Sequence, residues 1–159
     1  MIKVTIIALG RLKEKYLSEA VKEYSKRLSR YCVLDILELE PVRLPENPSQ
    51  SEINSALDKE AEMIIKKIPE GSEVYTLCVE GKQMSSPQLA DKVKAASNMG
   101  RSLTFIIGSS YGLSEKVKKC SNIRLSLSEM TFPHQLFRVM LLEQIYRAFK
   151  INEGSAYHK

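Results

Sequence analysis

Short apolar runs alternate with longer segments of helical periodicity along almost the whole chain. Five runs have strand character, being rich in apolar and β-branched residues and bounded by glycine, proline or charged residues: 2–9, 32–39, 73–79, 103–107 and 123–127. The segments between them place apolar residues three and four positions apart, the spacing of an amphipathic helix. This alternation predicts an α/β domain whose mostly parallel sheet carries helices on both faces.

The predicted helices have recognisable ends. Residues 69–71, Pro-Glu-Gly, end the second helical segment, and a proline at a first helical turn is well tolerated because its missing N–H has no partner there. Serine and threonine side chains can accept hydrogen bonds from the free N–H groups of a first turn. Candidate caps stand before three helices: Ser49 or Ser51, Ser85 or Ser86 followed by Pro87, and Thr131 followed by Pro133.

Length and composition indicate a single domain over residues 1–159, with 43% hydrophobic residues to build its core. No apolar run is long enough to span a membrane, and the N-terminal run predicts a strand and not a signal peptide. Three dispersed cysteines, Cys32, Cys78 and Cys120, favour a reduced cytoplasmic protein. With two histidines and no Cys-x-x-Cys pair, we expect no metal site.

Charge is distributed unevenly. The net charge is +5 over residues 1–33, −5 over 34–70, zero over 71–100 and +5 over 101–159. Two basic ends favour contact with a polyanion, although a mildly basic protein without a nucleic-acid partner has the same balance. The first helical segment carries a basic stripe that suits either phosphate contacts or a solvated face: Lys13, Lys15, Lys22, Lys26, Arg27 and Arg30.

Small or polar residues follow three of the predicted strands. Residues 80–82 follow the third strand, 108–112 the fourth and 128–132 the fifth. Ligands of open α/β sheets bind beyond the carboxyl ends of the strands, so the three loops predict one shared ligand site. The loop that begins at Gly108 lacks the spacing of a dinucleotide fingerprint and the Lys-Ser/Thr of a phosphate-binding loop.

The last helical segment, which Pro133 opens, is apolar on most of its circumference. Such a helix must be covered on most sides, and a domain of this size covers one side with its sheet. A second copy of the chain is the simplest cover for the other side, which predicts a two-fold homodimer. The alternative is a helix buried entirely within one subunit.

His134 and His158 are candidate general bases, because histidine titrates near neutral pH. His134 follows a loop of small residues and His158 lies in a polar tail, where packing in a core does not explain either residue. A cysteine–histidine nucleophile pair is conceivable, but nothing in the sequence positions one. No paired carboxylates and no metal-ligand spacing stand out.

Several sequence blocks resemble the RlmH family of bacterial ribosomal RNA methyltransferases, which belong to the trefoil-knotted SPOUT class. The resemblance covers nearly the whole chain, and its last three blocks are the most specific. Ser109 stands where the family usually has a second glycine, which keeps a small residue in that loop. The blocks are Ala8 to Lys13, Pro45 to Asn47, Phe105 to Gly108, Gly112-Leu113, Met130 to Gln135, Glu143 to Ala148, and Tyr157 to Lys159.

The resemblance implies a cytoplasmic homodimer with a C-terminal trefoil knot that binds S-adenosyl-L-methionine and no metal. Its substrate would be 23S ribosomal RNA within the assembled ribosome, methylated at N3 of a pseudouridine. In the family, the tail of one subunit is thought to complete the site of the other. The implied catalytic residues are His134, Arg138, Tyr157 and His158, and the implied cofactor-binding residues are Leu77, Gly108, Leu127, Ser128, Glu129, Met130, Thr131 and Phe132.

Two alternatives remain at the level of sequence. One is a ribosome- or RNA-binding factor without catalysis, because the basic ends would suffice to bind RNA. The other is a related SPOUT enzyme that acts on transfer RNA. The short chain, which has no added RNA-binding domain, favours a large preformed target such as an intact ribosome.

Overall fold

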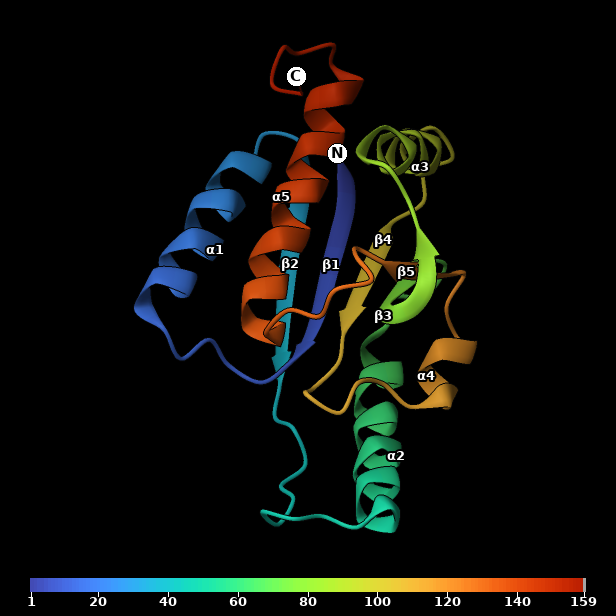
Figure 1. The fold of residues 1–159 in the computed structure, drawn as a ribbon. Helices are drawn as coiled ribbons and strands as arrows, with labels where there is room; N and C mark the ends of the chain where they lie inside the picture. Colours follow the sequence, from blue (N-terminus) through green and yellow to red (C-terminus); the bar gives the residue numbers. More distant parts are fainter. Residues whose placement is uncertain (159) are drawn as a thin grey trace.

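A computed structural model describes residues 1–158, and its centre is a five-stranded sheet (Figure 1). Every pairing between these strands is parallel, and their order across the sheet is β2-β1-β4-β3-β5. The alternation of strands and helices therefore predicted the fold class correctly. The strands are β1 (Ile2–Leu9), β2 (Cys32–Leu39), β3 (Glu73–Gln83), β4 (Leu103–Ile107) and β5 (Ile123–Ser126).

Helices cover both faces of the sheet, as the sequence predicted. On one face α5 (His134–Asn152) lies between α1 (Lys15–Leu28) and α3 (Ser86–Asn98), and it contacts both (Figure 1). The other face packs against α2 (Gln50–Lys67) and the short α4 (Glu115–Lys119). Capping boxes at Ser49 and Ser85 begin α2 and α3, so one serine of each predicted pair forms the cap.

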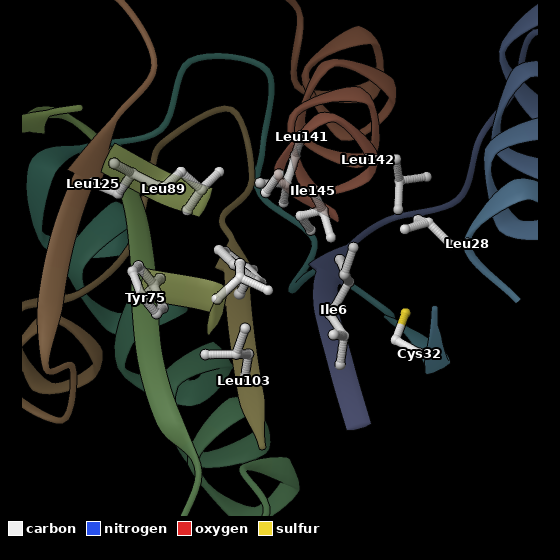
Figure 2. Close-up of a cluster of buried hydrophobic side chains, with 14 of the residues drawn as sticks. Ile6, Leu28, Cys32, Tyr75, Leu89, Leu103, Leu125, Leu141, Leu142 and Ile145 are labelled. Atoms are coloured by element: carbon white, nitrogen blue, oxygen red, sulfur yellow. The ribbon is translucent and has the colours of Figure 1, made fainter. Parts of the chain in front are cut away.

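Alternating side chains of β1 serve the two layers of the core. Ile6 points to the face that carries α5, where it joins Tyr75, Leu103 and the α5 residue Ile145 (Figure 2). Ile7 points to the opposite face, among side chains of α2 and α4. A strand that is apolar on both faces must be covered on both faces, which explains why the central strands have unbroken apolar sequences.

β3 is longer than predicted. Residues 80–82 lie inside this strand, so the prediction of a loop there was wrong. After a register shift between Leu77 and Lys82, β3 pairs with β5 again. The segment from Val79 onward is largely exposed. It needs no apolar side chains, so the sequence has no apolar run that would reveal this part of the strand.

Gly81 permits the close passage of β3 over β5. A Cβ atom on Gly81 would lie 2.7 Å from the backbone carbonyl carbon and oxygen of Arg124. We expect Gly81→Ala to lower the free energy of unfolding by about 2–3 kcal/mol, because backbone must move to admit the methyl group. Urea denaturation measures the loss, and the exposed neighbour Lys82→Ala should stay within about 0.5 kcal/mol of the wild type. Equal stability of the two variants would contradict this packing.

Helix α5 begins at His134, one residue later than predicted. Pro133 holds the N-cap position without a side-chain hydrogen bond, so Thr131 is not the cap. The sheet, α1 and α3 bury the inner surface of α5, while Leu136 keeps 37% of its surface exposed and Val139 and Met140 are half-buried. One subunit therefore covers much of α5 but not all of it. The homodimer and the trefoil knot both stay predictions.

Candidate active site

The middle of β3 and the carboxyl ends of β4 and β5 surround a cavity of about 450 Å³, which we call the strand-end cavity. Its walls are residues 77–80 of β3, the loop 107–113 after β4, and residues from 126 to 137 after β5. Of the three loops predicted to form a ligand site, those after β4 and β5 line this cavity, whereas of residues 80–82 only Glu80, which lies within β3, does so. Two features that the sequence did not single out for it are Lys118 of α4 and Phe137 of α5.

Gly108 begins the loop after β4 and packs closely against residues of the same loop. A Cβ atom on Gly108 would lie 2.4 Å from the carbonyl oxygen of Gly112 and 2.9 Å from Cγ of Leu113. The loop folds back because the Gly112 N–H donates to the Ser109 carbonyl over 2.8 Å, with Gly112 at a φ of +83°. The loop therefore requires glycine at position 108. The hydrogen bond that closes the turn uses the backbone carbonyl of Ser109.

The loop after β5 is shaped by its own hydrogen bonds. The Ser126 hydroxyl donates to the Ser128 carbonyl over 2.9 Å, and the Met130 N–H donates to the Ser128 hydroxyl over 3.0 Å. Seven of the eight predicted cofactor residues line the strand-end cavity: Leu77, Gly108, Leu127, Ser128, Met130, Thr131 and Phe132. The eighth, Glu129, is exposed and does not line it.

An ion pair lies at the edge of the strand-end cavity. Lys118 donates to Glu80, and this bond lowers the pKa of the Glu80 carboxyl. The sequence could not pair these residues, because Lys118 is 38 positions from Glu80 and reaches it only where α4 folds beside β3. Among residues 1–158, no group of three or more acidic, cysteine or histidine side chains is placed to hold a metal ion.

His134 lies at the first turn of α5 and lines the strand-end cavity. Burial lowers the pKa of its imidazole, and the positive charges of Arg138 and Lys13 lower it further. The amino end of a helix adds a partial positive charge of the same sign. At neutral pH the ring is therefore unprotonated, which is the state in which it can accept a proton.

The charge of Lys13 gives a way to test this environment. We expect Lys13→Gln to raise the pKa of His134, because one of two positive neighbours is removed. NMR titration of the imidazole resonances measures the change. The matched variant Lys22→Gln, on the exposed face of α1, should leave the pKa of His134 unaltered. An unchanged or lowered pKa in Lys13→Gln would contradict the arrangement.

Arg138 lies one turn after His134, as predicted, but its guanidinium is only 2% exposed. It donates to the Glu38 carboxylate over 2.5 Å and to the Gly10 carbonyl over 3.0 Å, which ties α5 to the ends of β1 and β2. In this arrangement the guanidinium is closed to a phosphate. It acts on His134 through its charge, and direct contact with a substrate stays a prediction.

Tyr157 and His158 lie against the far half of α5. The Tyr157 hydroxyl donates to the Glu143 carboxylate over 2.9 Å, and the Arg147 guanidinium lies 4.8 Å from the centre of the Tyr157 ring. His158 Nδ1 lies 3.3 Å from Nη1 of the same arginine. Burial and the bond to Glu143 raise the pKa of Tyr157, so its hydroxyl keeps its proton. Arg147 was not among the predicted site residues, although its spacing of four from Glu143 indicated an ion pair.

The tail is separated from His134 within one subunit. Glu143 is nine positions after His134 in the same helix, which corresponds to about 13 Å along the axis. Figure 1 shows the C-terminus at one end of α5 and the carboxyl ends of β1, β2 and β4 towards the other. One chain therefore does not bring Tyr157 and His158 to the strand-end cavity.

The chain has a parallel α/β sheet and a cavity lined by small-residue loops at the edge of that sheet. These features place it among the α/β proteins that bind a ligand at the carboxyl edge of the sheet. A family model described as "Predicted SPOUT methyltransferase" matches residues 2–158. The chain belongs to this SPOUT methyltransferase family. None of the helices described for residues 1–158 is long and apolar enough to cross a membrane.

Similar proteins share nearly the full length of the chain. A protein of Clostridium botulinum (strain Eklund 17B / Type B), named ribosomal RNA large subunit methyltransferase H, is 54% identical over 157 residues, which are 98% of this chain and 99% of the relative. A protein of Acetivibrio thermocellus with the same name is 48% identical over 158 residues, which are 99% of each chain. The resemblance to the RlmH family that was noted in the sequence is therefore confirmed.

Proposed function

We propose that this protein is a ribosomal RNA methyltransferase that transfers a methyl group from S-adenosyl-L-methionine to N3 of a pseudouridine in 23S RNA. The reaction would take place on assembled ribosomes in the cytoplasm. Membership of the SPOUT family and the names of relatives about 50% identical support this activity. The observation that carries it is the meeting of β3, the loops after β4 and β5, and His134 at one cavity.

The strand-end cavity fits the proposed cofactor. Its volume of about 450 Å³ lies within the usual range for small-molecule sites. Leu77, Ile107 and Leu127 offer apolar surface for an adenine ring. The serine and glycine loops place backbone groups at the wall, where they can hydrogen-bond a ligand without bulky side chains in the way.

The chemistry requires positioning and the removal of one proton. S-adenosyl-L-methionine supplies a methyl group that is already activated on a sulfonium, so no covalent intermediate with the protein is required. A ring nitrogen of neutral His134 would accept the N3–H proton of the target base, whose N3 would take the methyl group from the sulfonium. Alignment of the two reacting atoms accounts for most of the remaining rate enhancement.

We further propose a homodimer in which Tyr157 and His158 of one subunit reach the cavity of the other. The exposed strip of α5 continues into a groove of about 580 Å³ lined by apolar residues that include Met84, Leu127 and Met140. A second copy would bury this surface. The basic residues of both ends of each subunit would then contact the ribosomal RNA backbone.

Two measurements test the proposed function. Isothermal titration calorimetry should detect S-adenosyl-L-methionine binding to the purified protein at micromolar to millimolar concentrations. Ribosomes from cells that lack this methylation should then accept labelled methyl groups, and mapping should place them on one pseudouridine of the large subunit. Absence of binding at millimolar cofactor would refute the proposal. Transfer to tRNA in place of ribosomes would assign the enzyme to a different substrate.

A further inference from the structure

A second cavity adjoins the strand-end cavity and is not explained by cofactor binding. Its volume is about 680 Å³, and we call it the outer cavity. It lies between the loop of residues 40–45, helix α2 and the start of α5. The two cavities share one wall, formed by Ser109, Ser110, Tyr111 and His134. Any group in the outer cavity is therefore next to the candidate general base.

The rim of the outer cavity is basic. Arg11, Lys13 and Arg43 line it and are all exposed. Glu60 also lines the cavity, but it is 4% exposed, and its carboxylate accepts the N–H of Val42 over 3.0 Å. That carboxylate holds the loop of residues 40–45 in place, and its burial raises its pKa. Of the remaining charged groups on the rim, three are positive and only one, Glu40, is negative.

The outer cavity also offers apolar and aromatic surface. Leu9, Val42 and Leu57 contribute apolar surface. Tyr111 is 46% exposed at the shared wall, in the tight turn that Gly108 and Gly112 allow. An exposed aromatic ring beside positive side chains is the usual combination for holding an unstacked base and its phosphates.

The basic rim is fixed relative to His134. The Lys13 N–H donates to Oε1 of Gln135 over 3.0 Å, which links the segment after β1 to the first turn of α5. This hydrogen bond connects the segment that carries Arg11 and Lys13 to the helix that carries His134.

We propose that the outer cavity holds the target nucleotide of the RNA, with its base against Tyr111 and its flanking phosphates on Arg11, Lys13 and Arg43. This inference rests on the proposed function and names the substrate subsite. An enzyme that modifies a base ring must take it out of the stack, and the outer cavity receives the extruded unit. The base edge would then lie beside His134, where the two cavities meet and the methyl group can be reached.

Charge removal at the rim tests the phosphate contacts. The double variant Arg11→Gln/Arg43→Gln should raise the KM for ribosomes about tenfold and make the KM less sensitive to salt. The affinity for S-adenosylhomocysteine, measured by calorimetry, should stay unchanged, because neither residue lines the strand-end cavity. Arg101→Gln is the matched control, since Arg101 is exposed just before β4, at the opposite edge of the sheet.

Tyr111 tests the stacking contact. Tyr111→Ala should raise the KM for ribosomes about tenfold, and Tyr111→Phe should retain most of the wild-type value because the ring is kept. A KM for ribosomes that is unchanged in both the double variant and Tyr111→Ala would overturn this inference and leave the proposed function standing. If the wild-type protein does not bind S-adenosylhomocysteine, the proposed function and this inference both fail.

Discussion

Gly108→Ala is expected to weaken S-adenosyl-L-methionine binding on the order of a hundredfold, which corresponds to about 2.7 kcal/mol. The added methyl group would lie 2.4 Å from the Gly112 carbonyl oxygen and 2.6 Å from its carbonyl carbon. Both atoms are backbone, so the turn of residues 109–112 must move. That turn is one wall of the strand-end cavity, and its displacement changes the shape that the cofactor meets.

The methyl group of Gly108→Ala would not block the cofactor by direct contact. A side chain at Gly108 collides with its own loop before it reaches a ligand, so alanine is already large enough and valine should be worse. Overpacking of the loop should also lower the free energy of unfolding by about 1–3 kcal/mol. Binding must therefore be measured by calorimetry at a temperature where urea denaturation shows the variant to be folded.

Gly100→Ala provides the matched control for Gly108→Ala. Gly100 has a φ of +66° and lies at the amino end of β4, and a Cβ atom there meets no other atom within 4 Å. We expect it to lose about 1 kcal/mol of stability from the backbone conformation alone and to bind the cofactor normally. Wild-type affinity in Gly108→Ala would show that the strand-end cavity does not hold S-adenosyl-L-methionine.

The sequence predicted the central strands well, because burial on both faces leaves an unbroken apolar run. β1, β2 and β4 begin and end where the sequence indicated. The second half of β3 was missed because it is exposed and its residues are polar or glycine. What holds it is backbone pairing with β5, and backbone pairing has no side-chain pattern of its own.

The candidate site was predictable only in part, for a related reason. Loops that follow strands are brought together by the parallel topology, so residues 108–112 and 128–132 could be grouped before the structure was known, whereas Leu77 and Leu127 came from the family resemblance. Contacts between residues far apart in the sequence could not be predicted in this way. The pair Glu80–Lys118 depends on where α4 lies, and the outer cavity depends on a proline-containing loop whose course is set by Glu60.

Arg138 illustrates the limit of helical spacing. Its position four residues after His134 correctly placed both residues on one side of α5. Spacing did not indicate that the guanidinium would be buried against Glu38 and Gly10, since these partners are 100 and 128 residues away. A buried charge requires such partners, and only the three-dimensional fold supplies them.

The separation of Tyr157 from His134 leads to the last prediction, on dimers that combine two inactive subunits. His134→Ala should lower kcat by about a thousandfold, because the proton acceptor is lost. Tyr157→Ala should also cause a large loss if the tail completes the site of the partner subunit. A mixed dimer with His134→Ala in one subunit and Tyr157→Ala in the other then contains one site with both residues intact.

Mixed dimers should recover about half of the wild-type activity, since one of two symmetric sites is restored. Two affinity tags, one on each variant, allow the mixed species to be purified in sequence, and methyl transfer to ribosomes is then measured. Each doubly tagged parent variant serves as the control and should stay inactive. If the tail acted within its own subunit, every site of the mixed dimer would lack one residue. Activity no higher than that of the parents would therefore exclude a site shared between subunits.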